Sequence, residues 1–165
     1  SFVEDTQLTL GTHPLFSLIR KSVMIFYTTM KSAKVKYSLS LEGPGPVLTV
    51  DENKIRQVFF HLIKNSLEAM PNGGVLQIKA EEDEQSVTVY LTDSGPGIPT
   101  ESLDYVKDPF FTTKTYGNGI GLALVEQTIE AHGGKFSIHD APGGGTLATV
   151  CLPKSSPAPG GQETS

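Results

Sequence analysis

The chain has 165 residues, enough for one domain with a buried core, and its formal net charge of -5 argues against a basic surface for nucleic acid. The single cysteine, Cys151, cannot form an internal disulfide and lies in an alternating apolar run, so we interpret it as a core residue in a reducing compartment. The chain has no signal-peptide pattern and no apolar run near the roughly 20 residues of a membrane span, so we expect a cytoplasmic fragment that does not itself enter a membrane, whether or not its parent protein is anchored.

The first half of the chain predicts two helices separated by two strands. Apolar residues at three- and four-residue spacing indicate a packing helix from Pro14 to about Met30, with His13 as its cap. Asp51 can cap the second helix, whose wide apolar stripe runs from Ile55 to Leu67. The two strands are expected at 34–41 and 47–50.

The second half adds four strands and one helix. An acidic hairpin tip at 81–84 joins the first two of these strands, and Gly-rich turns bound the helix. The strands are expected at 75–80, 86–92, 135–139 and 146–152, and the helix at 119–132. Helices and strands separate into one layer each, so we expect an α/β protein, a two-layer sandwich with a mixed sheet covered on one face by helices. This domain should span 1–153, and 154–165 should form a disordered tail.

Asn65 lies among the apolar positions of the second helix, one turn after His61, so the two side chains point from nearly the same face. A carboxamide oxygen is a suitable hard ligand for Mg²⁺, which relies on few protein groups plus substrate phosphates. A hydrogen bond near the helix end is the simpler alternative for a lone asparagine. The glycine-rich loops downstream favour the metal.

Asp93 ends a predicted strand and precedes Gly95 and Gly97. A carboxylate at the mouth of a pocket can accept a hydrogen bond from the exocyclic amine of adenine, which guanine in the same pose does not offer. The alternative is an Asx-turn, which the Asp-Ser-Gly sequence favours. Both interpretations can hold at once.

The segment from Pro99 to Gly117 has little periodicity and lies between two glycine-rich turns, so we interpret it as a candidate flexible lid. Phe110 would anchor the lid, and the Thr113 hydroxyl could contact phosphate. Lys114 would place a positive charge near the phosphates, or it is an ordinary exposed lysine.

The second glycine-rich turn, Gly117-Asn118-Gly119-Ile120-Gly121, runs directly into the helix that begins near Ile120-Gly121-Leu122. Backbone amides at that helix start, helped by the positive end of the helix dipole, would bind a triphosphate. The turn is neither a Gly-Lys-Ser/Thr phosphate loop nor a dinucleotide fingerprint, because no strand immediately precedes it. A different nucleotide-binding fold is implied.

Together these motifs resemble the catalytic and ATP-binding domain of bacterial sensor histidine kinases, which has the Bergerat-type fold of the gyrase, heat-shock chaperone, histidine kinase and mismatch-repair ATPase superfamily. The resemblance covers nearly the whole chain. Its asparagine box lies at 57–70, its first glycine box at 93–99, its phenylalanine box at 108–114, its second glycine box at 117–124 and its last glycine motif at 143–146.

This resemblance implies a site for ATP and Mg²⁺. Asn65 would coordinate the metal and act in catalysis together with Lys114, Asp93 would bind the adenine amine, and Thr146 would support Asp93 through hydrogen bonding. The other implied nucleotide contacts are Gly95, Gly97, Ile98, Phe110, Thr113, Gly117, Gly119, Ile120, Gly121 and Leu122.

Two positions depart from the family's pattern. Asn118 stands where threonine is common, and His61 stands where asparagine or an acid is usual. His61 argues against a carboxylate-activated water and hence against an efficient hydrolase, whereas a substrate histidine is its own nucleophile. The resemblance therefore implies a protein histidine kinase that transfers the ATP γ-phosphoryl group to a histidine on a separate helical dimerisation domain, with a response regulator as an indirect partner.

Other functions stay open on the sequence. An anti-sigma-factor-type serine/threonine kinase would have the same fold, although the Phe-Phe-Thr-Thr-Lys element favours the histidine kinase. A conformational ATPase like the gyrase or mismatch-repair members fits His61 less well. A non-catalytic nucleotide-sensing module is the third class. Measuring Mg²⁺-dependent ATP affinity would distinguish such a module from a scaffold, whose pocket fails to bind ATP.

Overall fold

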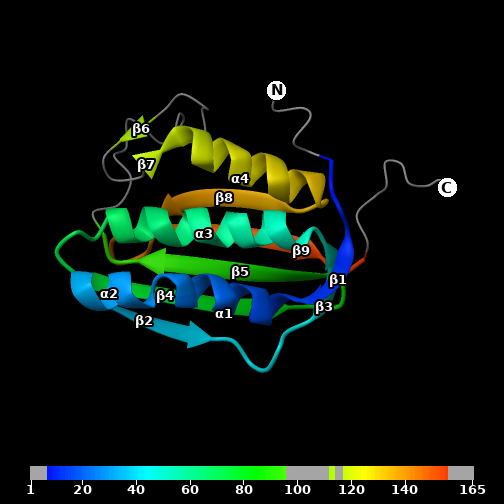
Figure 1. The fold of residues 1–165 in the computed structure, drawn as a ribbon, viewed down its shortest axis with the longest axis horizontal. Helices are drawn as coiled ribbons and strands as arrows, with labels where there is room; N and C mark the ends of the chain where they lie inside the picture. Colours follow the sequence, from blue (N-terminus) through cyan, green and yellow to red (C-terminus); the bar gives the residue numbers. More distant parts are fainter. Residues whose placement is uncertain (1–6, 96–111, 114–116, 156–165) are drawn as a thin grey trace.

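The structure is a computed structural model that describes residues 7–95, 112–113 and 117–155. Its main sheet has five strands in the order β2-β4-β5-β9-β8 (Figure 1). Strand β2 is parallel to β4, and the other neighbours are antiparallel, so the sheet is mixed as expected. The strands are β2 (Val35–Ser40), β4 (Gly74–Glu82), β5 (Ser86–Asp93), β8 (Lys135–Asp140) and β9 (Thr146–Pro153).

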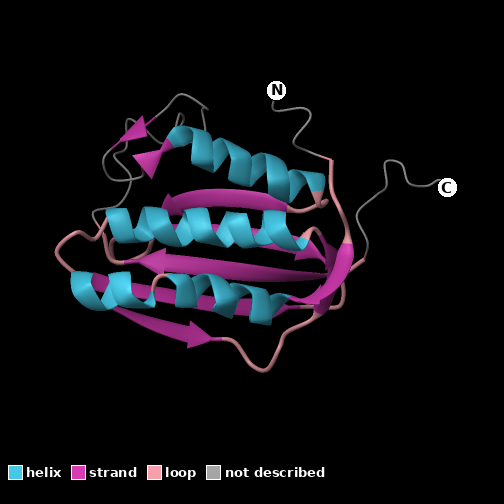
Figure 2. Ribbon diagram, viewed as in Figure 1, coloured by secondary structure: helices cyan, strands magenta, loops and turns pink. Residues whose placement is uncertain are grey.

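The helices lie side by side on one face of this sheet (Figure 2). They are α1 (Leu15–Ile25), α2 (Tyr27–Ala33), α3 (Glu52–Glu68) and α4 (Gly119–Ala131). The predicted two-layer α/β sandwich is therefore confirmed. None of the helices in the described part of the chain combines the length and the hydropathy that crossing a bilayer requires.

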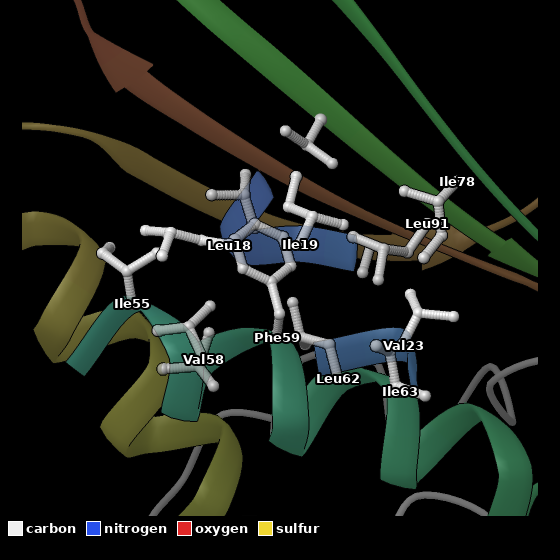
Figure 3. Close-up of a cluster of buried hydrophobic side chains, with 14 of the residues drawn as sticks. Leu18, Ile19, Val23, Ile55, Val58, Phe59, Leu62, Ile63, Ile78 and Leu91 are labelled. Carbon is white, nitrogen blue, oxygen red and sulfur yellow. The ribbon is translucent and has the colours of Figure 1, made fainter. Parts of the chain in front are cut away.

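The core fills the space between the two layers (Figure 3). Strand β5 alternates buried and half-buried residues, so one face packs on the helices while the other stays uncovered. Leu91 from this strand and Ile78 from β4 meet Ile19 of α1 and Phe59 of α3. The same alternation in β9 turns Val150 inward and Cys151 outward, so Cys151 is half-buried on the uncovered face and the prediction of a core cysteine was wrong.

The first predicted helix is broken into two. The backbone leaves helical geometry at Phe26, where φ is -99° and ψ is 9°, so α1 ends at Ile25 and α2 begins at Tyr27. The break sets the Phe26 ring against Phe60 of α3, with the ring centroids 5.0 Å apart, and Met30 still reaches the core. Because both helices bury the same face, hydrophobic periodicity alone could not reveal the break.

His13 does not cap α1, which corrects the sequence prediction. It lies in a short strand, β1 (Gly11–Pro14), which pairs antiparallel with β3 (Val47–Val50) and sets His13 opposite Leu48. Backbone carbonyls take over the capping role. The N–H of Leu15 donates to the Pro46 carbonyl at 3.0 Å, and that of Phe16 donates to the Pro44 carbonyl at 2.9 Å.

Asp51 caps α3, as predicted. Its Oδ1 accepts from the Lys54 N–H at 3.1 Å, and its Oδ2 accepts from the Thr9 N–H at 2.8 Å. The backbone N–H of Asp51 donates to Nε2 of the buried His132, at 3.0 Å, just beyond the end of α4. These bonds tie the start of α3 to the far end of α4 and to the segment that precedes β1.

Candidate functional site

Helices α3 and α4 meet the main sheet around a small cavity of about 20 Å³. This volume has room for about one water molecule, so the cavity is the base of a larger site rather than the whole of it. Its walls are mainly apolar, with a few polar groups placed among them. The lining residues are Leu62, Asn65, Ser66, Leu91, Asp93, Leu122, Ile138, Thr146 and Ala148.

Asp93 is the buried acid of this cavity. It is the last residue of β5 and lies opposite Thr146, the first residue of β9, so strand register alone brings the two together. The side chain is only 5% exposed, and burial raises the pKa of the Asp93 carboxyl. Hydrogen bonds from the Gly95 N–H, at 2.9 Å, and from Ser66 and Thr146 lower that pKa in part.

Ser66 is a site residue that the sequence analysis missed. It is buried on α3, next to Asn65, and its hydrogen bond to the Asp93 carboxylate links this helix to the end of β5. The sequence did contain a signal, because Ser66 follows Val58 and Leu62 at four-residue spacing. A hydroxyl that continues an apolar stripe must find a partner in the interior.

Asn65 contributes a carboxamide to the same cavity. Its side-chain nitrogen is buried and has no hydrogen-bond partner among the described residues. The nitrogen and oxygen of a carboxamide exchange places by rotation about the last side-chain bond, so either atom can take this position. A buried polar atom without a partner fits a group that binds from outside the chain.

Close backbone approach fixes the end of β5. Gly145 has a φ of +90°, and a Cβ there would overlap the carbonyl oxygen of Asp93. A Cβ on Gly95 would lie 2.9 Å from the carbonyl oxygen of Ala69. Glycine is therefore required on both sides of the buried acid, because any side chain would displace the backbone that carries it.

The second glycine-rich turn lies beside α3. Strand β6 (Thr112–Thr113) pairs with β7 (Gly117–Asn118), a small ladder that the sequence did not predict, and α4 begins directly afterwards at Gly119. The first-turn N–H groups of α4 have no partner within the helix and suit an anion. Nδ1 of His61 lies 3.5 Å from where a Cβ of Gly121 would be.

His61 lies on α3 one turn before Asn65 and does not line the cavity itself. Its ring meets Phe60 edge-on, with the centroids 5.8 Å apart. Burial, and then the nearby charge of Lys64, lower the pKa of the His61 imidazole. The lowered pKa favours the neutral imidazole, so His61 supplies no negatively charged carboxylate at this position.

The structure brings together some of the predicted site residues and leaves others outside its description. Asn65, Asp93, Leu122 and Thr146 line the cavity, and Gly95 and Gly121 adjoin it. The roles of all these residues stay predictions. Only secondary structure is described for Thr113, Gly117, Gly119 and Ile120, whereas Gly97, Ile98, Phe110 and Lys114, with the candidate lid apart from 112–113 and 117, lie outside the described residues.

The site thus consists of a buried acid on a mixed sheet, beside a helix that starts in a glycine-rich turn. A family model described as histidine kinase-, DNA gyrase B-, and HSP90-like ATPase matches residues 50–156. The chain belongs to this family. The range includes α3, the cavity and α4, so the family assignment rests on the elements that build the site.

Sensor histidine kinases are among its relatives. ZraS of Escherichia coli (strain K12) is 32% identical over 151 residues, which cover 92% of this chain and 32% of ZraS. Sporulation kinase A of Bacillus subtilis (strain 168) is 43% identical over 115 residues, which cover 70% of this chain and 19% of that protein. The chain therefore spans a third or less of the length of these curated relatives.

The solved catalytic domain of histidine kinase ThkA has the same fold. It superposes with a TM-score of 0.80 at 28% identity, covering 89% of this chain and 99% of that domain. A structure of ThkA in complex with the response regulator protein TrrA also matches, with a TM-score of 0.77 at 26% identity, over 88% of this chain and 42% of that one. The resemblance indicated by the sequence is thereby confirmed.

Proposed function

We propose that this domain binds Mg²⁺-ATP and transfers the γ-phosphoryl group to a histidine on a separate helical dimerisation domain of its parent kinase. The observation that carries the proposal is the convergence on one cavity of Asp93, Thr146 and Asn65. Gly121, in the first turn of α4, lies beside His61 of α3, the helix that also carries Asn65. One end of the site has the chemistry to recognise a purine, and the other has the chemistry to bind phosphate.

Asp93 is the residue suited to select adenine. A carboxylate that accepts hydrogen bonds only can bind an exocyclic amine, and its burial removes competing water. The bonds from Ser66, Gly95 and Thr146 hold the carboxylate in one orientation. An amine donor from the nucleotide would complete its hydrogen-bonding capacity and favour the ionised form.

Mg²⁺ fits the residues that are present. The described residues contain no group of three or more His, Cys, Asp or Glu side chains that could hold a metal by itself. A Mg²⁺ ion keeps several waters and binds through few protein groups plus phosphate oxygens, so one carboxamide, that of Asn65, is a sufficient protein ligand. When bound, the ion would neutralise charge on the phosphates during transfer.

The chain's own residues would position the donor rather than activate a nucleophile. The acceptor imidazole nitrogen forms the new P–N bond, the bond from Pγ to the bridging oxygen breaks with its electron pair staying on ADP, and the ring N–H proton is lost to solvent. Backbone N–H groups at the start of α4 would hold the phosphates in line for this step. His61 offers no carboxylate to activate water at this position of α3, which favours transfer over hydrolysis.

The test uses the parent kinase with γ-labelled ATP. We expect an acid-labile, base-stable phosphohistidine on the dimerisation domain that depends on Mg²⁺ and is lost in Asn65→Ala and Asp93→Asn. A Lys36→Ala variant on the exposed strand β2 is the matched control. A base-labile phosphoserine or phosphothreonine would instead support the anti-sigma-factor-type kinase, and ATP binding without any transfer would support a nucleotide-sensing module.

A response regulator would be the indirect partner. ThkA, whose catalytic domain matches this chain, has been solved together with TrrA, and such a regulator would take the phosphoryl group from the phosphohistidine. We expect the labelled parent kinase to lose its label to its cognate regulator without further ATP.

A further inference from the structure

A second hollow, which we call the α3–α4 groove, runs between those two helices and has a volume of about 280 Å³. It is distinct from the cavity around Asp93, with which it shares no lining residue. It is lined by Lys54, Gln57, Val58 and His61 of α3 and by Leu124, Val125, Gln127 and Thr128 of α4.

The groove has the make-up of a protein-docking surface. Its exposed lining is mainly polar: the amides of Gln57 and Gln127 and the ammonium group of Lys54 lie along it, and half-buried Leu124 adds an apolar contact, whereas Val58 and Val125 are buried beneath it. Specific interfaces carry direct hydrogen bonds as well as apolar contact, and the groove offers groups for such bonds. Lys54 and His61 are seven residues apart, so the groove follows α3 for two turns, about 10 Å at 1.5 Å per residue.

One lining side chain has an unmet hydrogen-bonding need. The carboxamide oxygen of Gln127 is buried and has no partner among the described residues. Buried acceptors in native proteins are nearly always paired with a donor. A partner that seats in the groove and donates an N–H or O–H to Gln127 would meet this need, and a carboxylate on it would suit Lys54.

The groove also leads toward the place where phosphate would bind. His61 belongs to the groove lining and at the same time lies 3.5 Å from the Cβ position of Gly121, in the first turn of α4. A segment lying along the groove would therefore end beside the phosphate-binding start of α4. The cavity around Asp93, where the purine would be held, is lined by other residues of α3 and does not include His61.

We propose that the α3–α4 groove docks about two turns of the helix that carries the phosphoacceptor histidine. This inference rests on the proposed function and names the surface through which the acceptor reaches the nucleotide. The docked helix presents a hydrogen-bond donor to Gln127 and an acidic side chain to Lys54, and it brings the acceptor imidazole to the His61 end of the groove.

The experiment fills the groove in the intact parent kinase. Gln57 is exposed, so Gln57→Trp adds bulk to the groove without entering the core. Gln77→Trp is the matched control, because Gln77 is exposed on β4 and its neighbours Leu76 and Ile78 face the core, which places it on the opposite side of the sheet. A charge reversal, Lys54→Glu, is a second and independent variant.

The measurements are the single-turnover rate of phosphohistidine formation at saturating ATP and the affinity for Mg²⁺-ATP by calorimetry. We expect Gln57→Trp and Lys54→Glu to slow transfer by about tenfold or more, the scale of losing one central interface contact. The ATP affinity should stay within about twofold of the wild type, a difference well under 1 kcal/mol. Gln77→Trp should match the wild type in both measurements.

Three results would overturn the inference. Unchanged transfer in both groove variants would show that the acceptor approaches from elsewhere. A parallel loss of ATP affinity would assign the groove to the nucleotide instead. If the wild-type parent kinase binds ATP but forms no phosphohistidine, the proposed function fails and the docking surface fails with it, an outcome separate from the first two.

Discussion

Asp93 and Thr146 face each other across β5 and β9, at the point where one strand ends and the other begins. The pairing puts a buried carboxylate at the sheet end nearest α3 and leaves its remaining acceptor capacity directed into the cavity. Burial disfavours the ionised form of the Asp93 carboxyl, whereas the proposed recognition of the adenine amine needs that form.

The first prediction concerns nucleotide recognition. Replacing Asp93 by asparagine should weaken Mg²⁺-ATP binding by about 10- to 100-fold, because a charged hydrogen bond to the adenine amine contributes about 1.5–3 kcal/mol. Isothermal titration calorimetry with ATP and with GTP measures this. Wild type should bind ATP much more tightly than GTP, and Asp93→Asn should reduce this difference in affinity between the two nucleotides. Equal ATP affinity in the two proteins would remove Asp93 from the site.

The second prediction concerns the stability of the nucleotide-free protein. Burial raises the pKa of Asp93 in the folded state. The favourable contribution of Asp93 to the free energy of unfolding is therefore present below the pKa of the unfolded chain, and it is lost as pH rises through the pKa of the folded state. The free energy of unfolding of Asp93→Asn, minus that of wild type, should therefore increase with pH over this window and then level off. Urea unfolding between pH 4 and pH 8, with about half-unit steps, measures the difference.

Asp83 provides the control of opposite sign for that experiment. Backbone hydrogen bonds from Gln85 and Ser86 lower the pKa of this exposed carboxyl. Its contribution is present above the unfolded pKa and is lost as pH falls through the folded pKa. The corresponding difference for Asp83→Asn should therefore decrease as pH rises toward the ordinary carboxyl value of 3.8 and stay flat above it, so this series must extend down to about pH 2.5. The same slope for both variants would contradict the assignment of Asp93 as a buried acid.

The third prediction separates two glycines of one turn. Gly143 and Gly145 both have positive φ, +85° and +90°, but only Gly145 would place a Cβ against the backbone of Asp93. Gly143→Ala should destabilise the protein by about 1 kcal/mol through backbone conformation alone. Gly145→Ala should destabilise it by about 2–4 kcal/mol and also weaken ATP binding, because the Asp93 backbone must move. Similar melting temperatures for the two variants would refute the close approach.

The fourth prediction concerns His132. Its Nδ1 lies 2.7 Å from the Thr128 carbonyl oxygen, and its Nε2 accepts from the Asp51 N–H, so the ring is neutral with its proton on Nδ1. Burial, chiefly, lowers its pKa below the ordinary value of 6.5. The unfolded chain therefore binds the proton more tightly, and stability should fall as pH drops from about 7 through 6.5 and below.

His132→Gln tests this dependence. The variant should be less stable than wild type at pH 7.5, yet lose less additional stability on acidification to about pH 5.5. His61 also has a lowered pKa and contributes with the same sign, so His61→Gln serves as the comparison. A pH slope that His132→Gln leaves unchanged would place the titrating group elsewhere.

Much of the fold could be predicted from the sequence, because its signals are local. Alternation along β5 and β9, the apolar stripe of α3 and the cap at Asp51 each act over a few residues. The break at Phe26 and the strand around His13 depend on tertiary partners, Phe60 and Leu48, which no local pattern specifies. Tertiary packing overrides propensity at such positions.

The site residues also differ in whether a local sequence pattern could reveal them. Asp93 and Asn65 stand out in the sequence because polar residues next to glycines or within an apolar stripe need an explanation. Ser66 and the α3–α4 groove depend on how distant elements pack, since Ser66 matters only once β5 ends beside α3. Spacing along one helix cannot show which groups face it from another.

The double role of Asp51 has a mechanical consequence. One oxygen of its carboxylate accepts from the first turn of α3 and the other accepts from the amide of Thr9, so a force on the segment that precedes β1 is transmitted to the helix that bears Asn65. A force applied at residues 7–10 would reach the Asn65 carboxamide, the proposed ligand of Mg²⁺, along α3, and it need not pass through the sheet.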